Sequence, residues 1–306
     1  MLLDVQQVAV LVNPTSGRGR ASRIANQVCV RLREETGLQV LLRAGRDAAE
    51  AAALFVQYAA MGGTAVVAVG GDGTVHLAAQ AVAQTQTPLG VIPAGSGNDI
   101  ARSLGLPTDP IAAASVLASC LRAHRTRSID AVRAAGRWYL GVLGAGFDSR
   151  VNDRANRMTW PAGRSRYNVA IAAELRTFRP IPFRLVLDGE SWETAAMLVA
   201  VGNGPMYGGG MRVCEGAILD DGLLDITVLG PVSKAEFVRV FPRVYRGTHV
   251  THPAVTQRRA RVVTVNAAGV TAYADGERLS LLPVTCEVVP GAVEVLSAQP
   301  APTVNA

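Results

Sequence analysis

Lysine and cysteine are scarce in this chain of 306 residues, and neither residue type forms a functional cluster. Lys234 is the single lysine and no Gly-Lys-Ser/Thr occurs, so the sequence contains no P-loop. The four cysteines, Cys29, Cys120, Cys214 and Cys286, lie far apart, and no two of them form a Cys-x-x-Cys pair. We therefore expect reduced, structural thiols in a cytoplasmic protein.

The sequence lacks the pattern of a signal peptide or a membrane-spanning helix. Residues 51–71 carry no charge, but Gln57 and the pair Gly62-Gly63 divide this run into a helix and a strand. Asp4 and the short apolar run after it predict a first strand at the N-terminus. The formal net charge of +6 favours anionic partners, such as a negatively charged membrane or nucleotides.

The apolar segments predict two domains of different class, an α/β domain followed by a β-rich one. A chain of this length, with 49% hydrophobic residues, is long enough for two cores. Residues 1–129 alternate short apolar runs with segments of helical spacing, which predicts a parallel sheet with right-handed crossovers. Residues 130–289 contain short runs rich in Val, Leu and Thr, which predict mostly antiparallel strands. Helical insertions are expected near 150–178 and 233–246.

Three glycine-rich turns follow predicted strands of the first domain. They are "NPTSGRGR" (13–20), "GGDGT" (70–74) and "PAGSGND" (93–99). Ligands of an open parallel sheet collect at the carboxyl ends of its strands, where glycines let backbone N–H groups approach an anion. The three turns together suit a polyphosphate, although a single one is equally typical of an ordinary strand-to-helix connection.

One carboxylate, Asp72, lies among the glycines of the second turn, directly after a buried strand. Phosphates repel a carboxylate unless a cation lies between them. Asp72 therefore predicts a Mg²⁺ ion that accompanies a bound polyphosphate.

Six segments occur in an order that resembles a known family. They are "VNPTSGRG", "VGGDGTVHLAAQ", "LGVIPAGSGNDIAR", "LGAGFDSRV", "AILDDGLLDI" and "ADGE". Together they resemble the diacylglycerol kinase catalytic family, which comprises soluble bacterial lipid kinases and is related to sphingosine and ceramide kinases. "GGDGT" alone is shared with NAD kinases and, loosely, with phosphofructokinases, but the set with "PAGSGND" and "DDGLLD" is more specific. The resemblance spans residues 6–296.

The resemblance implies a fold and a catalytic centre. Residues 1–129 would form a nucleotide-binding α/β domain like that of NAD kinases, with residues 290–306 returning to it. Residues 130–289 would form a β-sandwich that carries the lipid pocket. Asp72 would hold the catalytic Mg²⁺, with Asp99 and Asp130 in a nearby network of carboxylates and water. Glu277 would be the general base that takes the proton from a lipid hydroxyl.

The resemblance also implies a second metal site and an ATP pocket. A structural Mg²⁺ would bind the Asp221 side chain and the backbone carbonyls of Ile218 and Leu223. Taken by spacing alone, "DDG" and "ADGE" are good β-turn sequences and favour a turn over a site. The ATP pocket would be formed by Asn13, Pro14, Thr15, Ser16, Gly17, Gly71, Asp72, Gly73, Thr74 and Ser96.

Several positions depart from the pattern of the family. His76-Leu77 replaces the common Asn-Glu pair, so the glutamate that closes this motif is missing, which weakens ribose contacts unless His76 compensates. Arg43 stands at a position that commonly holds threonine, and we place it in the nucleotide site because an arginine can reach a phosphate. Ser96 and Gly97 replace threonines in the third turn.

We expect an ATP- and Mg²⁺-dependent kinase that phosphorylates a lipid hydroxyl, most simply that of diacylglycerol, to give phosphatidic acid. An NAD kinase is one alternative, against which the "DDGLLD" segment argues. A catalytically silent protein that binds lipid or nucleotide is another, motivated by the missing glutamate at Leu77.

The segment 150–167 carries arginines around Trp160, a mixture that suits peripheral docking on an anionic membrane as well as a solvated loop. No nucleic-acid module is visible, and a homodimer is one assembly that the sequence leaves open. His249 and His252 are expected in a surface loop, because no cysteine or carboxylate accompanies them as a metal ligand.

Overall fold

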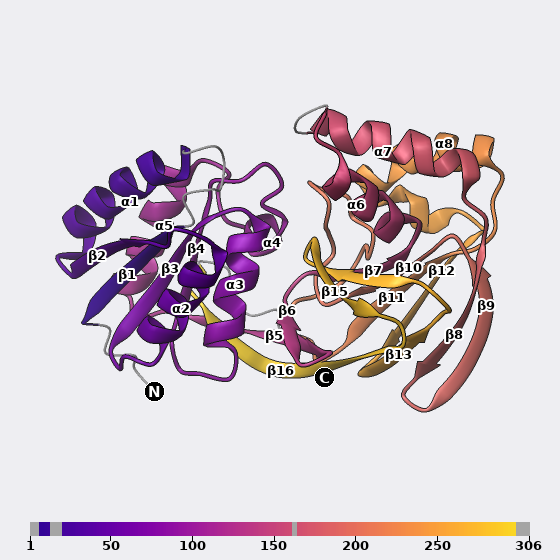
Figure 1. The fold of residues 1–306 in the computed structure, drawn as a ribbon. Coiled ribbons are helices and arrows are strands. Elements are labelled where there is room, and N and C mark those ends of the chain that lie inside the picture. The colour runs from indigo at the N-terminus through magenta and orange to yellow at the C-terminus, as the bar shows by residue number, and fades with distance from the viewer. Residues whose placement is uncertain (1–5, 13–19, 161–163, 298–306) are drawn as a thin grey trace.

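The computed structural model describes residues 6–12, 20–160 and 164–297, and these residues form two domains joined by a shared sheet (Figure 1). The first domain has four parallel strands in the order β2-β1-β3-β4. Every residue of β3 is buried, as expected for a continuous apolar strand that is covered on both faces. These strands are β1 (Gln7–Val12), β2 (Gln39–Ala44), β3 (Thr64–Gly70) and β4 (Leu89–Pro93).

Helices cover the parallel sheet in two packed pairs, α1 with α5 and α2 with α3 (Figure 1). The carboxylate of Asp47 accepts a hydrogen bond from the Glu50 amide and caps the start of α2, as Asp does at many helix N-termini. The helices of this domain are α1 (Arg20–Thr36), α2 (Ala48–Ala59), α3 (Asp72–Val82), α4 (Asp99–Ser103) and α5 (Pro110–Arg122).

The second domain is a sandwich of antiparallel strands. Its six-stranded sheet has the order β12-β11-β10-β7-β14-β15, and an apolar core separates this sheet from the far half of the first one. The strands that build the sandwich are β5 (Arg127–Ala134), β6 (Arg137–Tyr139), β7 (Val142–Gly146), β8 (Ile181–Leu187), β9 (Glu190–Ala196), β10 (Leu198–Gly202), β11 (Leu224–Leu229), β12 (Val255–Ala260), β13 (Val262–Asn266), β14 (Thr271–Ala274), β15 (Glu277–Leu281) and β16 (Val284–Val295). The predicted class, α/β followed by β, is confirmed.

Helices interrupt this domain in the two predicted places and lie over one end of the sandwich (Figure 1). They are α6 (Phe147–Arg157), α7 (Arg164–Thr177), α8 (Lys234–Val240) and the 3₁₀ helices η2 (Phe241–Arg246) and η3 (Thr248–Thr251). No helix within the described ranges combines the length and the apolar character that crossing a bilayer needs.

Two strands run through both domains and join them. β5 begins at Arg127, and β16 pairs with it along much of its length before Val295 meets Leu89 of β4 in parallel register. The boundaries expected between residues 129 and 130 and between residues 289 and 290 therefore both fall inside strands. The domains are consequently connected by a continuous sheet, which holds the loops at their junction in a defined place.

Candidate active site

Two tight turns, one from each domain, face each other at the junction. The first follows β3 and opens α3, whose N-cap is Gly71. The second joins β14 to β15 through Asp275 and Gly276, which have φ angles of 52° and 83°. Two positive φ angles are typical of the type I′ hairpin turn that Asp-Gly favours. A Cβ added at Gly73 would lie 3.0 Å from Glu277 Oε1, so Glu277 contacts the turn that carries Asp72.

An acidic pair lies beside these turns. Asp72 Oδ1 accepts a hydrogen bond from the Ile100 amide at 3.1 Å, and Asp99 Oδ2 accepts one from the Gly209 amide at 2.7 Å. Burial, followed by the nearby charge of Asp99, raises the pKa of Asp72 to about 6. A Cβ at Gly97 would come within 2.6 Å of Asp72 Oδ2, so the close approach of this loop requires glycine.

This pair fits a divalent cation that is shared with a phosphate ligand. Asp99 Oδ1 is buried and has no hydrogen-bond partner within the described part of the chain, although Arg102 Nη1 lies 3.9 Å away. Two carboxylates with incomplete compensation are what Mg²⁺ commonly takes from a protein, with water and phosphate oxygens as its other ligands. In the part of the chain that the structure describes, no three His, Cys, Asp or Glu side chains are arranged to hold a metal without such help.

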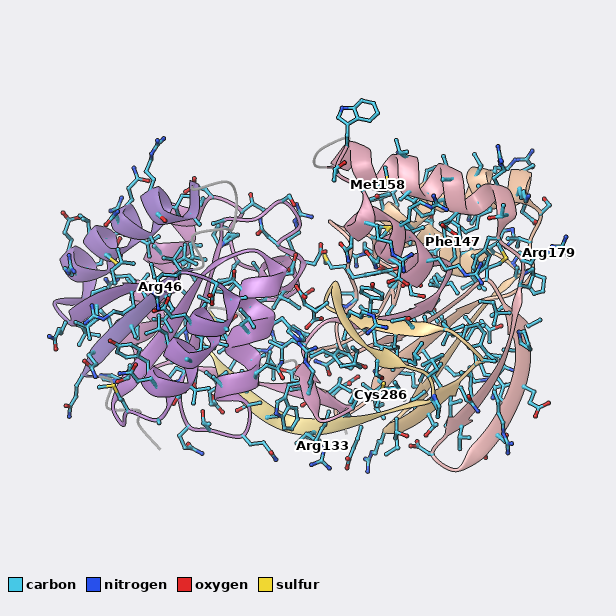
Figure 2. The ribbon with its side chains drawn as sticks, in the orientation of Figure 1. Arg46, Arg133, Phe147, Met158, Arg179 and Cys286 are labelled. Carbon is cyan, nitrogen blue, oxygen red and sulfur yellow. The ribbon has the colours of Figure 1, made fainter. Side chains whose placement is uncertain are left out.

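A largely apolar cavity of about 640 Å³ opens from the acidic pair into the second domain. Asp72, Asp99 and Asp275 line one end of it, and side chains from α6, β10, β11, α8 and η2 line its body. Phe147 lies inside this domain (Figure 2), where its ring meets those of Phe178 and Phe237 at centroid distances of 5.2 and 4.9 Å. The cavity therefore has the chemistry of a site for an apolar ligand with one polar end.

A smaller cavity of about 240 Å³ lies next to the same turns. Glu277 and Arg137 line it from the second domain, and the first turn of α3 lines it from the other side. Asp72 lines the large cavity and Glu277 lines the small one, and the contact of Glu277 with Gly73 makes the two cavities neighbours. The residues that line the smaller cavity are Ala48, Gly71, Gly73, Thr74, His76, Leu77, Arg137 and Glu277.

The structure brings together most of the residues predicted for the nucleotide site that it describes. Gly71, Gly73 and Thr74 line the small cavity, and Ser96 lines the large one. Arg43 is different, because its exposed guanidinium donates to the carbonyl of Leu42 and it lines neither cavity. The predicted contacts of Asn13, Pro14, Thr15, Ser16 and Gly17 lie outside the described residues.

The contacts of Asp130 are with the loop that follows residue 217 and with β16. Its carboxylate accepts hydrogen bonds from the amides of Gly222 and Gly291, both at distances below 2.9 Å, and its predicted water network with Asp72 and Asp99 stays a prediction. The observed contacts follow from the sheet, because β5 carries Asp130 alongside β16 and the loop at residues 218–223. Asp130 therefore belongs to the surroundings of the predicted second metal site.

The loop at residues 218–223 and the strands beside it bring together more carboxylates than arginines. Asp220 pairs with Arg127 at 2.8 Å, and Arg259 pairs with Asp221 and, at 3.3 Å, with Asp225. Asp221 Oδ1 also accepts from the Leu223 amide at 3.1 Å, while Ile218 is partly exposed.

Two buried oxygens here, Asp220 Oδ1 in the loop and Asp225 Oδ2 at the start of β11, have no hydrogen-bond partner among the residues that the structure describes. Burial raises the pKa of Asp225 to about 6. The surplus of negative charge and the two orphaned oxygens fit a cation at this loop, although Arg259 already shares Asp221.

Sequence reasoning missed several polar residues at the junction. Asp148 lines the large cavity, and its segment "LGAGFDSRV" gave no sign that the carboxylate would face an apolar space. His249 and His252 also line this cavity; His249 is buried in η3, so the expected surface position is wrong for His249, and His252 pairs with Glu236 at 3.2 Å. The sequence around these residues did not predict their positions, because the side chains that contact them come from distant segments.

Comparisons with known proteins agree with this arrangement. A family model described as the diacylglycerol kinase catalytic domain matches residues 7–134, and one described as the YegS C-terminal NAD kinase beta sandwich-like domain matches residues 141–297. A diacylglycerol kinase of Mycobacterium tuberculosis is 43% identical over 300 residues, which is 96% of each chain. One of Bacillus subtilis is 28% identical over 283 residues, covering 91% of this chain and 92% of the relative.

Solved structures show the same fold. A crystal structure of a diacylglycerol kinase from Bacillus anthracis matches with a TM-score of 0.72 at 21% identity, covering 97% of this chain and 98% of the other. An NAD kinase from Archaeoglobus fulgidus in complex with ATP matches with a TM-score of 0.53 at 15% identity, covering 96% and 94%. Both likenesses concern the fold.

Proposed function

Because the chain belongs to the diacylglycerol kinase family and is therefore a kinase, we propose that it transfers the γ-phosphoryl group of ATP to the hydroxyl of a lipid, with diacylglycerol as acceptor and phosphatidic acid as product. The observation that carries this proposal is the contact of Glu277 with the Asp72 turn at the end of a large apolar cavity. A membrane lipid has one polar end and a long apolar body, and this cavity offers the complementary surfaces.

In the proposed reaction the two turns have different roles: one binds the phosphates and the other positions the general base. The lipid oxygen attacks the γ-phosphorus, an O–P bond forms, the bond to the β-phosphate oxygen breaks, and ADP leaves. Glu277 accepts the proton that the hydroxyl loses, since an alcohol is a poor nucleophile while protonated. The backbone of Gly71 and Gly73 at the start of α3 faces the phosphates.

Mg²⁺ held by Asp72 and Asp99 would supply neutralisation of the phosphate charge when it is bound. Burial first, and the charge of Asp99 second, raise the pKa of Asp72, so a cation that offsets both costs is favoured beside these carboxylates. The residues themselves contribute alignment, because the Ile100 and Gly209 amides hold the two carboxylates in fixed orientations. Most of the rate enhancement in phosphoryl transfer comes from such alignment and from charge stabilisation.

Transfer from labelled ATP to diacylglycerol in mixed micelles tests this function. Glu277→Gln should lower the rate by at least about a hundredfold, the lower range for loss of general-base catalysis. Asp72→Asn should lower it by at least about as much, because the phosphate charge then loses its stabilisation. Glu287→Gln is a matched control, because Glu287 is an exposed carboxylate of β16 that pairs with Arg133. Full activity of both site variants would overturn the assignment, and phosphorylation of NAD in place of lipid would favour the NAD kinase alternative.

The same proposal places the protein at the surface of an anionic membrane, from which the lipid enters. The indole of Trp160 is 80% exposed just beyond the end of α6. Arg154 pairs with Glu174 at 2.5 Å, and Arg150 lies over the ring of Phe178, yet both arginines remain exposed to solvent. An exposed aromatic beside basic side chains supports docking at the headgroup level.

A further inference from the structure

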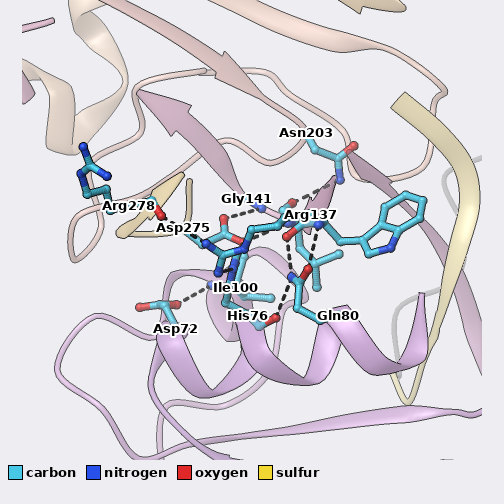
Figure 3. A network of polar contacts seen from close by, with 11 residues as sticks. Asp72, His76, Gln80, Ile100, Arg137, Gly141, Asn203, Asp275 and Arg278 are labelled. Atoms are coloured by element: carbon cyan, nitrogen blue, oxygen red, sulfur yellow. Dashed lines mark hydrogen bonds and ion pairs between the residues drawn. The ribbon is translucent and has the colours of Figure 1, made fainter. Parts of the chain in front are cut away.

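One face of α3 carries a polar residue at every fourth position. Asp72, His76 and Gln80 are four residues apart, so they lie on the same side of the helix. Figure 3 shows His76 and Gln80 directed at the strand and turn that approach from the second domain. Gln80 bonds the backbone of Trp138, donating to its carbonyl at 2.7 Å and accepting from its amide at 2.9 Å. The helix therefore contacts the second domain through polar groups.

His76 lies in the centre of this contact and is 1% exposed. Arg137 Nη2 is 2.9 Å from His76 Nε2. A guanidinium only donates, so Nε2 accepts and the proton of the neutral imidazole resides on Nδ1. Nδ1 then donates to Asp275 Oδ2 at 3.4 Å. The neighbours of His76 thus determine its tautomer.

Asp275 is held by more than His76. Its carboxylate also accepts from the amides of Leu140 at 3.0 Å and Gly141 at 2.9 Å. A Cβ at Gly141 would come within 2.7 Å of Asp275 Oδ1, so only glycine permits this approach. The φ of 52° at Asp275 is uncommon for a residue with a side chain, and three hydrogen bonds to its carboxylate hold it there.

The same network reaches the other side of Glu277. Arg137 Nη1 donates to the carbonyl of Arg278 at 3.1 Å, so one guanidinium joins His76 to the first residues of β15. Glu277 therefore lies between two residues whose positions are held, Asp275 before it and Arg278 after it. Figure 3 shows Asp275 and Arg278 on the same hairpin, next to α3.

We infer that His76 is a positioning residue for Glu277, which it holds against α3 through Asp275 and Arg137. The inference rests on the proposed function, in which Glu277 is the general base. Glu277 itself is exposed as the first residue of β15, directly after the two-residue turn, and its alignment depends on how firmly that turn is held. A displacement of about 1 Å at a catalytic group can lower the rate by about a hundredfold. The network therefore affects the rate through the position of Glu277, although it does not touch the reacting atoms.

Substitutions at His76 can remove its two hydrogen bonds separately. His76→Asn keeps a donor at the δ position for Asp275 and loses the acceptor for Arg137. His76→Gln keeps an acceptor at the ε position for Arg137 and loses the donor for Asp275. His76→Phe retains the ring and removes both bonds. Gln80→Leu is the matched control, because it removes bonds between α3 and β6 that do not involve the hairpin.

Steady-state kinetics with ATP and diacylglycerol micelles and hydrogen exchange together test the inference. We expect His76→Phe to lower kcat by about a hundredfold with little change in the KM for ATP, and the Asn and Gln variants to recover part of it. Amide exchange at residues 275–278 should accelerate in His76→Phe but not in Gln80→Leu. Histidine ¹⁵N spectra of the wild type should show the Nδ1–H tautomer.

The outcomes separate this inference from the function on which it rests. Full activity of both Glu277→Gln and Asp72→Asn would overturn the proposed function. Loss of activity in Glu277→Gln together with wild-type kcat and unchanged exchange in His76→Phe would overturn the positioning role alone. If His76→Phe does not fold, the Asn and Gln variants decide, because kcat and exchange equal to the wild type in both would also overturn it.

Discussion

The hydroxyl of Tyr207 donates a hydrogen bond to Asp148 Oδ2 at 3.2 Å within the wall of the large apolar cavity. Asp148 Oδ1 is buried and has no hydrogen-bond partner among the described residues. Burial is the main cause that raises the pKa of Asp148 to about 7, and the bond from Tyr207 offsets only part of it. This carboxyl group therefore changes charge near neutral pH.

This titration predicts a pH dependence of stability. Between the unfolded pKa of about 3.9 and the folded value, the native protein keeps a proton that the unfolded chain has released. This contribution to the free energy of unfolding is fully present below a pH of about 3.9 and is lost as the pH rises through about 7. Its upper bound is ~4 kcal/mol. We expect Asp148→Asn to melt at a higher temperature than the wild type at about pH 8 and to show a smaller difference at about pH 5. Parallel melting curves at both pH values would contradict this titration.

A bulky side chain in the large cavity should block the lipid and leave ATP binding intact. Val240 lines the cavity at the end of α8, so Val240→Trp would fill part of the volume. The added indole would occupy space that part of the lipid chain otherwise fills, so about 1.5–3 kcal/mol of apolar burial of the lipid is lost. We therefore expect the KM for diacylglycerol to rise by about tenfold or more. Val238→Trp is the control, since Val238 lies on the same helix but is 59% exposed. Equal kinetics of the two variants would argue that the acceptor binds elsewhere.

Magnesium should stabilise the fold through the loop at residues 218–223. Addition of Mg²⁺ should raise the melting temperature. The free energy of unfolding should increase by as much as ~2.7 kcal/mol when the Mg²⁺ concentration is about a hundred times its Kd. Asp221→Asn should abolish most of this shift, whereas Asp72→Asn should retain it. Glu193→Gln, a change at an exposed carboxylate of β9, serves as control. Wild-type shifts in Asp221→Asn would mean that Arg259, not a metal, compensates this loop.

Trp160 should contribute to binding of anionic vesicles. We expect Trp160→Ala to weaken binding to phosphatidylglycerol vesicles by about tenfold, as estimated for one large apolar side chain transferred to the interface. Val56→Ala removes an exposed apolar side chain from α2 of the first domain and should bind like the wild type. Cosedimentation at low and high salt measures both variants. Undiminished binding of Trp160→Ala would place the docking surface elsewhere.

Much of the fold was predictable because its signals are local. The apolar run before "GGDGT" identified β3, and Asp275-Gly276 has the composition of the I′ turn that the structure contains. The sequence also carried the Asp72 and Glu277 segments, but the resemblance, not their spacing, connected them. The hydrogen-bond partners of Asp130 could not be predicted, because they come from residues 222 and 291, which no nearby pattern reveals.

By itself, the order of residues determined the alternation of strands and helices, the glycine turns and the change from parallel to antiparallel pairing. These follow from side-chain periodicity and backbone freedom over a few neighbouring positions. Tertiary structure alone decided that His76 meets Arg137, 61 positions away, and Asp275, 199 positions away. Those contacts depend on the long pairing of β16 with β5 and on its contact with β4 at Val295, which set the second domain against α3. Electrostatic environment is a property of that assembled junction, so the polarity and pKa values of its carboxylates emerge only when the distant strands have paired.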